Sequence, residues 1–242
     1  MRAMVLAAGL GTRLRPLTND RPKALVEIGG RTLLEITLTR LGSFGVRDVI
    51  VNVHHFADMV VDFLRAHDNF GLHVEISREE ILLDTGGGLK KASWFFLQDA
   101  GRLEEPFLLH NVDVISDIDL AEVLKFHTEQ HALATLVVQK RESSRQLLFS
   151  HEGELGGRWI SGKDPEFVRP TPNLQAFAFS GIHAISPRLL PKIDEEGVFS
   201  IIPTYLRLAG EGERIVAFRA DEYSWRDLGR LEDLEKAEAE LR

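Results

Sequence analysis

Two glycines and two cations follow an apolar segment near the start of the chain. Residues 6–25 read LAAGLGTRLRPLTNDRPKAL, which places Gly9 and Gly11 before Arg13 and Lys23. Glycine lets the backbone approach a ligand closely because it carries no side chain. Arginine and lysine side chains pair with negatively charged groups. These residue types at this spacing predict a site for an anionic ligand.

Two general nucleotide-loop patterns do not describe this segment. A P-loop requires a Gly-Lys-Ser or Gly-Lys-Thr triplet, and none lies nearby in the sequence. The dinucleotide fingerprint could begin at Gly9 and Gly11, but Leu14 stands where its third glycine is needed. The pattern that remains is longer and more specific. It reads Leu-Ala-Ala-Gly-x-Gly-Thr-Arg-x-x-Pro-Leu-Thr, followed by Arg-Pro-Lys at 21–23.

Two aspartates stand in further short motifs. LLHNVDV sets Asn111 and Asp113 at the end of an apolar strand, and YSWRDLGRLEDL sets Asp227 shortly before a helix. A lone aspartate at a strand end is usually a turn former, and Asp227 could cap the helix that follows Gly229. From the residues alone, a structural role and a chemical role both stay open for these aspartates.

The elements that must position these residues alternate between strands and helices. Strands are expected at 1–8, 47–55, 72–77, 106–114 and 132–139, with helices at 32–43, 56–67, 88–97 and 120–130. This alternation predicts an α/β fold in three layers, with a mainly parallel, mixed sheet between helices. Ligands of such sheets bind beyond the carboxyl ends of the strands. The glycine loop and Asp113 would both lie at that edge.

The second half of the chain is less regular. Residues 140–173 contain short strand-like pieces between Gly, Ser and Pro, which we interpret as a hairpin-rich insertion over the site. The regular pattern resumes at 174–186 and 199–209, continues with a strand at 214–220, and ends with a helix at 230–242. We therefore expect a single domain over residues 1–242 rather than two domains.

Composition excludes several classes of function. The net charge of −8 argues against nucleic acid as the main partner. The absence of cysteine excludes disulfides, thiolate catalysis and cysteine-ligated zinc. The apolar N-terminal segment is too short for a signal peptide or a membrane span. We expect a soluble, cytoplasmic protein that does not act at a membrane.

The long glycine-loop pattern resembles that of the sugar-1-phosphate nucleotidylyltransferases, also called nucleotide-sugar pyrophosphorylases. The resemblance covers nearly the whole chain and implies their Rossmann-like nucleotide-diphospho-sugar transferase fold. It also implies that the loop wraps a nucleoside triphosphate, whose phosphates meet backbone N–H groups and cations. The alternative is a glycine turn with two solvated cations. The resemblance implies nucleotide binding by Ala7, Ala8, Gly9, Gly11, Thr12, Arg13 and Lys23.

EEILLDTGGGLKKA is also similar to a stretch of this family. There Thr85, Gly86 and Gly87 would lie against the base and ribose, closely enough that a side chain would clash. An ordinary helix start capped by Asp84 or Thr85 is compatible with that role. Several members carry a glutamine that reads the base where this chain has Leu82-Leu83. We therefore expect backbone groups near Ala7, Ala8 and Gly86 to select UTP, with some use of another pyrimidine nucleotide.

The resemblance implies that both aspartates bind a metal ion. In the family an aspartate at the position of Asp113 holds Mg²⁺, a hard cation that prefers carboxylate oxygens. Asp227 would be the second ligand, and Asn111 would contact the nucleotide. The catalytic residues that the resemblance implies are Arg13, Lys23, Asp113 and Asp227.

The acceptor side is where the sequence departs from the family pattern. FSGIHAISP matches a family strand that contacts the sugar, so Ser180 and Gly181 are expected to offer hydrogen bonds. Many members also carry Glu-Lys-Pro, whose lysine contacts the sugar phosphate, and this chain has no such triplet. Lys163 in SGKDPEF is the substitute that we predict, and a solvated loop lysine is the alternative.

The expected activity joins a nucleoside triphosphate to a sugar 1-phosphate and releases pyrophosphate. The compact chain most resembles short bacterial members, which include N-acetylmuramate-1-phosphate uridylyltransferases. A GTP-dependent mannose or heptose 1-phosphate guanylyltransferase, a CTP:phosphocholine-type cytidylyltransferase and a non-catalytic nucleotide-sensing module are the alternatives. The base, the sugar and the choice between monomer and homodimer stay open.

Overall fold

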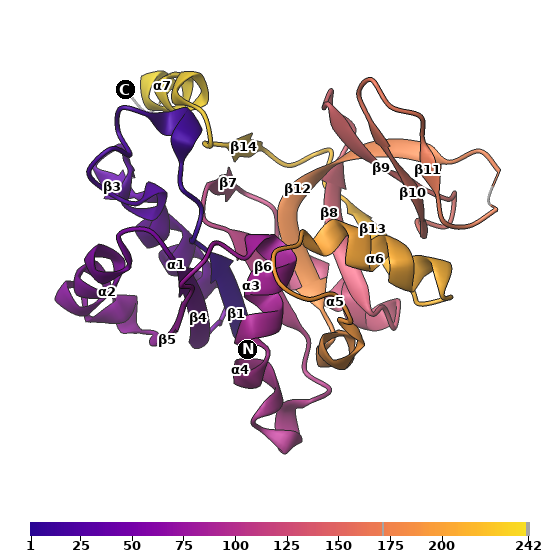
Figure 1. Cartoon of the computed structure of the whole chain (residues 1–242), viewed down its shortest axis with the longest axis horizontal. Helices are drawn as coiled ribbons and strands as arrows, with labels where there is room; N and C mark the ends of the chain where they lie inside the picture. Colours follow the sequence, from indigo (N-terminus) through magenta and orange to yellow (C-terminus); the bar gives the residue numbers. More distant parts are fainter. Residues whose placement is uncertain (171, 241–242) are drawn as a thin grey trace.

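A mixed β-sheet forms the centre of the molecule, with helices against both of its faces (Figure 1). The computed structural model describes residues 1–170 and 172–240. The strands of this sheet are β1 (Arg2–Leu6), β4 (Asp48–Val53), β5 (His73–Arg78), β6 (Phe107–Asn111), β8 (Ala134–Gln139), β9 (Arg145–Phe149), β10 (Leu155–Ile160), β11 (Glu166–Phe167), β12 (Gln175–Ile185) and β13 (Ile215–Arg219). Their order is β11-β10-β9-β12-β6-β1-β4-β5, and β8 pairs with both β12 and β13.

The part of the sheet next to the glycine loop is parallel. β1 pairs with β4 and β6, and β4 pairs with β5, all in parallel. The central strands β1, β4 and β6 are almost entirely buried, as expected for parallel strands that are covered on both faces. The strands that were predicted at 1–8, 47–55, 72–77 and 106–114 are confirmed, and their carboxyl ends meet at one edge.

Successive side chains of β1 enter two separate hydrophobic cores, because neighbouring residues of a strand point to opposite faces. Ala3 and Val5 belong to one core, and Met4 belongs to the other. Helices that contribute to the first are α1 (Leu33–Ser43), α2 (Ala57–Ala66), α5 (Leu120–Glu129) and α7 (Leu231–Glu240). Those of the second are α3 (Asp84–Ala92), α4 (Trp94–Leu97) and α6 (Ile201–Gly210). The predicted three layers are confirmed.

Strand β12 joins the parallel part of the sheet to an antiparallel part. It pairs with β6, β8 and β9, in each case antiparallel. β9, β10 and β11 continue outward from it as an antiparallel ribbon, which makes up most of the segment interpreted as a hairpin-rich insertion. Figure 1 shows this ribbon at the opposite end of the sheet from α1 and α2.

A two-stranded ladder outside the main sheet brings distant parts of the sequence together. β7 (Val114–Ser116) pairs antiparallel with β14 (Trp225–Asp227), so that Asp227 lies opposite Val114. The Leu228 N–H also donates to the Asp113 carbonyl at 2.8 Å. The ladder therefore holds the two aspartate motifs side by side. A second small ladder joins β2 (Glu27–Ile28) to β3 (Arg31–Thr32).

The predicted helix at 88–97 begins earlier than expected and is interrupted. α3 starts at Asp84 and includes the three glycines, and Ser93 separates it from α4. Glycine is a poor helix former, but the N–H groups of Gly86 and Gly87 donate to the Phe199 carbonyl at 2.9 and 3.2 Å. Tertiary packing therefore decides where this helix begins.

The closing helix, α7, runs to Glu240. The last two residues of the predicted helix, 241 and 242, lie outside the described residues. Within the part of the chain that the structure describes, no helix is both long enough and apolar enough to cross a membrane.

Candidate active site

Four charged side chains converge around Gly229. A Cβ atom added to this glycine would lie 2.7 Å from Asp227 Oδ1, 2.9 Å from Arg13 Nη2 and 3.1 Å from Asp113 Oδ2. Lys23 completes the group, because its ammonium pairs directly with the Asp113 carboxylate. The structure thus brings together the residues that were expected to form the catalytic set, from the glycine loop, the end of β6 and the end of β14.

The two aspartates of this group differ electrostatically. Burial raises the pKa of Asp113, but the adjacent ammonium of Lys23 and hydrogen bonds from the backbone and Asp227 together outweigh burial, so that the pKa lies below its usual value. Burial and the negative charge of Asp113 both raise the pKa of Asp227. The Gly229 N–H donates to Asp227 Oδ1 at 2.7 Å, and this bond fixes the carboxylate toward Asp113.

The two aspartates form a donor set that suits the metal implied by the sequence. No cluster of three or more His, Cys, Asp or Glu side chains suited to a metal occurs in the described residues. The site offers two carboxylates, whose oxygens lie 2.7 and 3.1 Å from one point beside Gly229. Mg²⁺ is usually bound through one or two carboxylates, with water and substrate phosphates as its other ligands. Asp113 and Asp227 therefore fit Mg²⁺.

A cavity of about 350 Å³ opens between the glycine loop and the start of α3. Six residues that were expected to bind the nucleotide or the metal line it, namely Ala8, Gly9, Lys23, Thr85, Asn111 and Asp113. Leu82 and Val198 add apolar surface to the same cavity. Small residues, an apolar wall and a cation at one end suit a base with attached phosphates.

Gly86 and Gly87 face the protein interior. A Cβ atom on Gly86 would lie 2.3 Å from the Phe199 ring, and one on Gly87 would lie 2.5 Å from the Gly197 carbonyl oxygen. The predicted clash between a side chain here and a nucleotide base is therefore wrong, because the protein's own atoms occupy that space. The Gly86 N–H was expected to be free to contact the base. It donates instead to the Phe199 carbonyl, so it is not available for that contact.

Gly11 and the two residues after it form a tight turn in the glycine loop. Gly11 has a positive φ of 63°, and a Cβ there would lie 2.9 Å from the Thr18 side chain and 3.0 Å from Lys23 Cβ. Only glycine therefore fits beside Lys23 at this turn. Thr12 and Arg13 follow in a short 3-10 turn, Thr12–Leu14.

Two residues of the nucleotide cavity were missed by the sequence analysis. Asn52 at the end of β4 and Glu79 just after β5 line the cavity, although both are almost fully buried. The Ala7 N–H donates to Asn52 Oδ1 at 2.7 Å, so this backbone group is also already engaged. The available signal was a polar residue within the apolar strand DVIVNV.

A second cavity, of about 500 Å³, has Asp227 in its lining and adjoins the first cavity at Asn111. Asn111 lines both cavities, and Gly181 and Lys163 line the second as expected. Gly181 has a positive φ of 73°, and a Cβ there would lie 2.8 Å from the Asn111 amide nitrogen. Ser180, which was expected to offer a backbone or hydroxyl hydrogen bond to the sugar, is fully buried. Its carbonyl accepts a hydrogen bond from the Trp225 indole at 2.7 Å.

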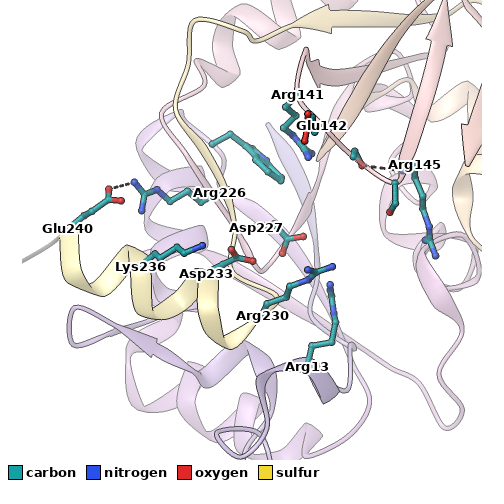
Figure 2. Close-up of a pocket in the computed structure, with 13 residues that line it drawn as sticks. Arg13, Arg141, Glu142, Arg145, Arg226, Asp227, Arg230, Asp233, Lys236 and Glu240 are labelled. Atoms are coloured by element: carbon teal, nitrogen blue, oxygen red, sulfur yellow. Dashed lines mark hydrogen bonds and ion pairs between the residues drawn. The ribbon is translucent and has the colours of Figure 1, made fainter. Parts of the chain in front are cut away.

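Arg141 is one of the cations of this cavity that the sequence analysis did not identify. Its guanidinium lies 3.8 Å from the centre of the Trp225 ring and donates to the Phe179 carbonyl at 2.7 Å. Burial lowers the pKa of Arg141 from the usual value, and the nearby charge of Asp227 acts in the opposite direction. Arg141 and Asp227 also line a third cavity of about 980 Å³, together with Arg13 and Arg230. Figure 2 shows Asp227 between Arg141 on one side and Arg13 and Arg230 on the other.

The chain is similar in sequence to known nucleotidyl transferases. A sequence model of the nucleotidyl transferase family matches residues 2–147. The chain is 36% identical to the N-acetylmuramate alpha-1-phosphate uridylyltransferase of Caulobacter vibrioides, over 99% of this chain and 96% of that protein. It is 30% identical to the mannose-1-phosphate guanyltransferase of Yarrowia lipolytica, over 96% of its own length, but spans only 62% of that protein.

The fold also matches a solved structure of this kind. A UDP-glucose pyrophosphorylase complexed with UDP-glucose superimposes with a TM-score of 0.76, covering 99% of this chain and 97% of that one. The identity is 17%, so the likeness concerns the fold alone. It confirms the predicted Rossmann-like fold.

Proposed function

The chain belongs to the nucleotidyl transferase family, and we propose that it transfers a nucleoside monophosphate from UTP to a sugar 1-phosphate, with release of pyrophosphate. N-acetylmuramate 1-phosphate is the acceptor that we favour. The relative from Caulobacter vibrioides that carries this name is matched along nearly its whole length.

The observation that carries the proposal is the convergence of Arg13, Lys23, Asp113 and Asp227 at one point. Lys23 and Asp113 line the first cavity, and Asp227 lines the second. A nucleotide in the first cavity would place its phosphates beside the glycine loop and Lys23. A sugar 1-phosphate in the second would approach from the side of Asp227. The two reactants would then meet in line at the charged group, and this positioning supplies a large part of the rate enhancement.

The proposed reaction is a direct displacement at phosphorus. An oxygen of the sugar phosphate forms a bond to the α-phosphorus as the bond from that phosphorus to the pyrophosphate oxygen breaks. The bonding electron pair leaves with pyrophosphate. Arg13 and Lys23 offset the negative charge that gathers on the phosphate oxygens. A side-chain nucleophile is not required.

Asp113 and Asp227 would hold Mg²⁺, which when bound supplies positive charge to the phosphate oxygens. The Leu228 N–H ties the backbone of the Asp227 segment to the Asp113 carbonyl, so both carboxylates could hold the same ion. Lys23 balances the charge of Asp113 and so keeps this carboxylate ionised. Nucleotide contacts by Ala8, Gly9, Thr85 and Asn111 are part of the same proposal.

Arg141 is our candidate for the cation that binds the sugar phosphate, beside the predicted Lys163. Stacking on Trp225 and the hydrogen bond to Phe179 hold its guanidinium in place at the cavity wall. Lys163 lines the same cavity from an exposed loop. A side chain that is already held in position loses less conformational entropy when it binds an anion.

A guanylyltransferase acting on mannose 1-phosphate is the second candidate, because the relative from Yarrowia lipolytica has that activity in its name. The test is a pyrophosphate-release assay with each of the four nucleoside triphosphates and a panel of sugar 1-phosphates and phosphocholine. We expect the highest kcat/KM with UTP and N-acetylmuramate 1-phosphate. Preference for GTP with mannose 1-phosphate would favour the second candidate, and no release with any pair would contradict both.

A further inference from the structure

We propose that Asn52 and Glu79 act together as a positioning pair that fixes the width of the nucleotide cavity and thereby favours a pyrimidine base over a purine. The inference rests on the proposed function in one respect, since it takes the cavity beside the glycine loop as the site of the base. Neither side chain is assigned to the reaction itself.

A continuous chain of hydrogen bonds runs through the two side chains. The Ala7 N–H donates to Asn52 Oδ1 at 2.7 Å, and Asn52 Nδ2 donates to Glu79 Oε1 at 2.7 Å. The Leu83 N–H donates to the other oxygen, Glu79 Oε2, at 2.9 Å. Asn52 is 2% exposed and Glu79 is 5% exposed. The chain therefore connects the start of the glycine loop to the residue before α3 through two buried side chains.

The third glycine of the Gly-Gly-Gly run makes room for this pair. A Cβ atom on Gly88 would lie 2.8 Å from Glu79 Oε1 and 2.9 Å from Asn52 Nδ2. Any larger residue at 88 would push into the hydrogen bond between the two side chains. A glycine in the middle of α3 is unfavourable for the helix, and its presence here is explained by the pair beneath it.

Two donors require the carboxylate at position 79. Asn52 Nδ2 and the Leu83 N–H both point hydrogens at Glu79, one at each oxygen. A carboxylate has two acceptor oxygens, whereas an amide has one oxygen and one donor nitrogen. Glutamine at 79 would therefore set a donor against a donor in either orientation, and a buried unpaired donor is costly.

The chain of hydrogen bonds limits the width of the cavity and therefore the size of the base that it accepts. Ala8 and Gly9 line one wall of the cavity directly after Ala7, and Leu82 and Thr85 line the other wall around Leu83. Because the chain of hydrogen bonds ties Ala7 to Leu83, the two walls cannot separate without breaking a buried bond. A cavity held at this width favours the smaller base, and a broken chain lets the walls move apart to accept a purine.

The test exchanges the amide and carboxylate groups between positions 52 and 79. Asn52→Asp sets two carboxylates against each other, and Glu79→Gln leaves a donor unpaired. In the double variant, the amide nitrogen introduced at position 79 donates to the carboxylate introduced at position 52. The Leu83 N–H then donates to the amide oxygen at position 79, so that every bond is restored. We expect each single variant to lower the ratio of UTP affinity to GTP affinity by about 10-fold, on the scale of one lost buried hydrogen bond, and the double variant to recover most of it.

The affinities are measured by calorimetry with UTP and GTP in the presence of Mg²⁺, so the readout does not depend on turnover. Thr135→Val is the matched control, because it removes a buried hydrogen bond to His127 away from the cavity. It should lower stability and leave the affinity ratio unchanged. Where a single variant fails to fold, the affinity ratio of the folded double variant is compared with that of the wild type, and a ratio that stays low counts against the inference.

Two results would overturn the inference. One is a loss that is equal for UTP and GTP in the single variants. The other is a double variant no better than the worse single variant. Failure of the proposed function is a separate result, because it would appear as a wild-type protein that binds nucleotide with the expected ratio but releases no pyrophosphate.

Discussion

Lys23 shows how one residue can serve both the fold and the chemistry. Its ammonium pairs with Asp113 where both side chains are largely buried, with exposures of 12% and 14%. Removing one partner of such a pair leaves the other charge uncompensated. We expect Lys23→Ala to lower turnover by about 100-fold, the scale of one lost charge-stabilising donor, and also to raise the pKa of Asp113. Turnover is measured at saturating substrates, with circular dichroism to establish folding. Near-normal turnover would contradict the role of Lys23.

Arg141 and Lys163 make competing predictions for the sugar phosphate. If Arg141 binds it, Arg141→Gln should raise the KM for the sugar 1-phosphate by about 30-fold, as expected for a lost hydrogen bond to a charged group. The KM for UTP should change little. Lys163→Gln should have the smaller effect, and the exposed Arg65→Gln on α2 serves as a control for a lost surface charge. A larger effect at Lys163 would reverse the assignment.

The residue types of the site were predictable because the glycine-loop pattern and the two aspartate motifs are local in sequence. What could not be predicted was which atoms surround each residue. Gly86 and Gly87 are residue types expected in a nucleotide site. In the fold, glycine is required at these positions because Phe199 and Gly197 leave no room for a side chain, and those residues lie more than 100 positions away in the sequence. Arg141 was missed because its partners Phe179 and Trp225 become neighbours only in the fold.

At the scale of elements, the ladder between β7 and β14 is the decisive connection. Strand positions were predictable from apolar runs, and parallel pairing followed from the alternation with helices. The antiparallel pairing of Val114 with Asp227 could not be predicted, because it joins segments over 100 residues apart through three-residue strands. Such short strands carry almost no pattern of their own. The start of α3 was also missed, since glycines are read as loop residues until their packing is known.

The ladder leads to a prediction about the aspartates it joins. Asn is close to Asp in size but carries no charge, so Asp113→Asn and Asp227→Asn should fold. Each should lose most activity and require more Mg²⁺. Because both carboxylates are proposed to hold one ion, the double variant should be little worse than the worse single variant. Turnover is measured against Mg²⁺ concentration for all four proteins. Losses that multiply, or wild-type activity that survives full chelation by EDTA, would exclude a shared ion.

At the scale of the whole molecule, buried histidines link stability to pH. His127 in α5 hydrogen-bonds Thr135 at 2.9 Å, and burial lowers its pKa to about 4, with the charge of Arg188 acting in the same direction. The unfolded chain then binds a proton near pH 6.5 that the folded chain does not. Stability contributed by this neutral histidine is present above that pH and is lost as the pH falls toward 4.

Unfolding in urea between pH 7 and pH 4 tests this expectation. His127→Gln should show a loss of unfolding free energy that is smaller than that of the wild type by about 1.4 kcal/mol per pH unit in this range. His183 and His110 are also buried with lowered pKa values, so the variant should keep part of the dependence. An identical pH dependence in the variant and the wild type would show that His127 is not protonated differently in the two states.

The overall fold was more predictable than the contacts of individual residues, because the α/β alternation and the three layers depend on many residues at once. The domain organisation, a cytoplasmic location and the choice between monomer and homodimer stay predictions. The proposed transfer of a nucleoside monophosphate to a sugar 1-phosphate requires a site that binds two substrates. Both cavities and the charged group are required for it, so it is a property of the molecule rather than of any one motif.

The most direct test is a quantitative product analysis. The wild-type protein is incubated with UTP, Mg²⁺ and N-acetylmuramate 1-phosphate, and the products are quantified by anion-exchange chromatography and ³¹P NMR. We predict that sugar nucleotide and pyrophosphate form in equal amounts, and that neither forms when the sugar 1-phosphate is omitted. Release of UMP in place of a sugar nucleotide, or pyrophosphate release that is independent of the acceptor, would contradict the proposed transfer.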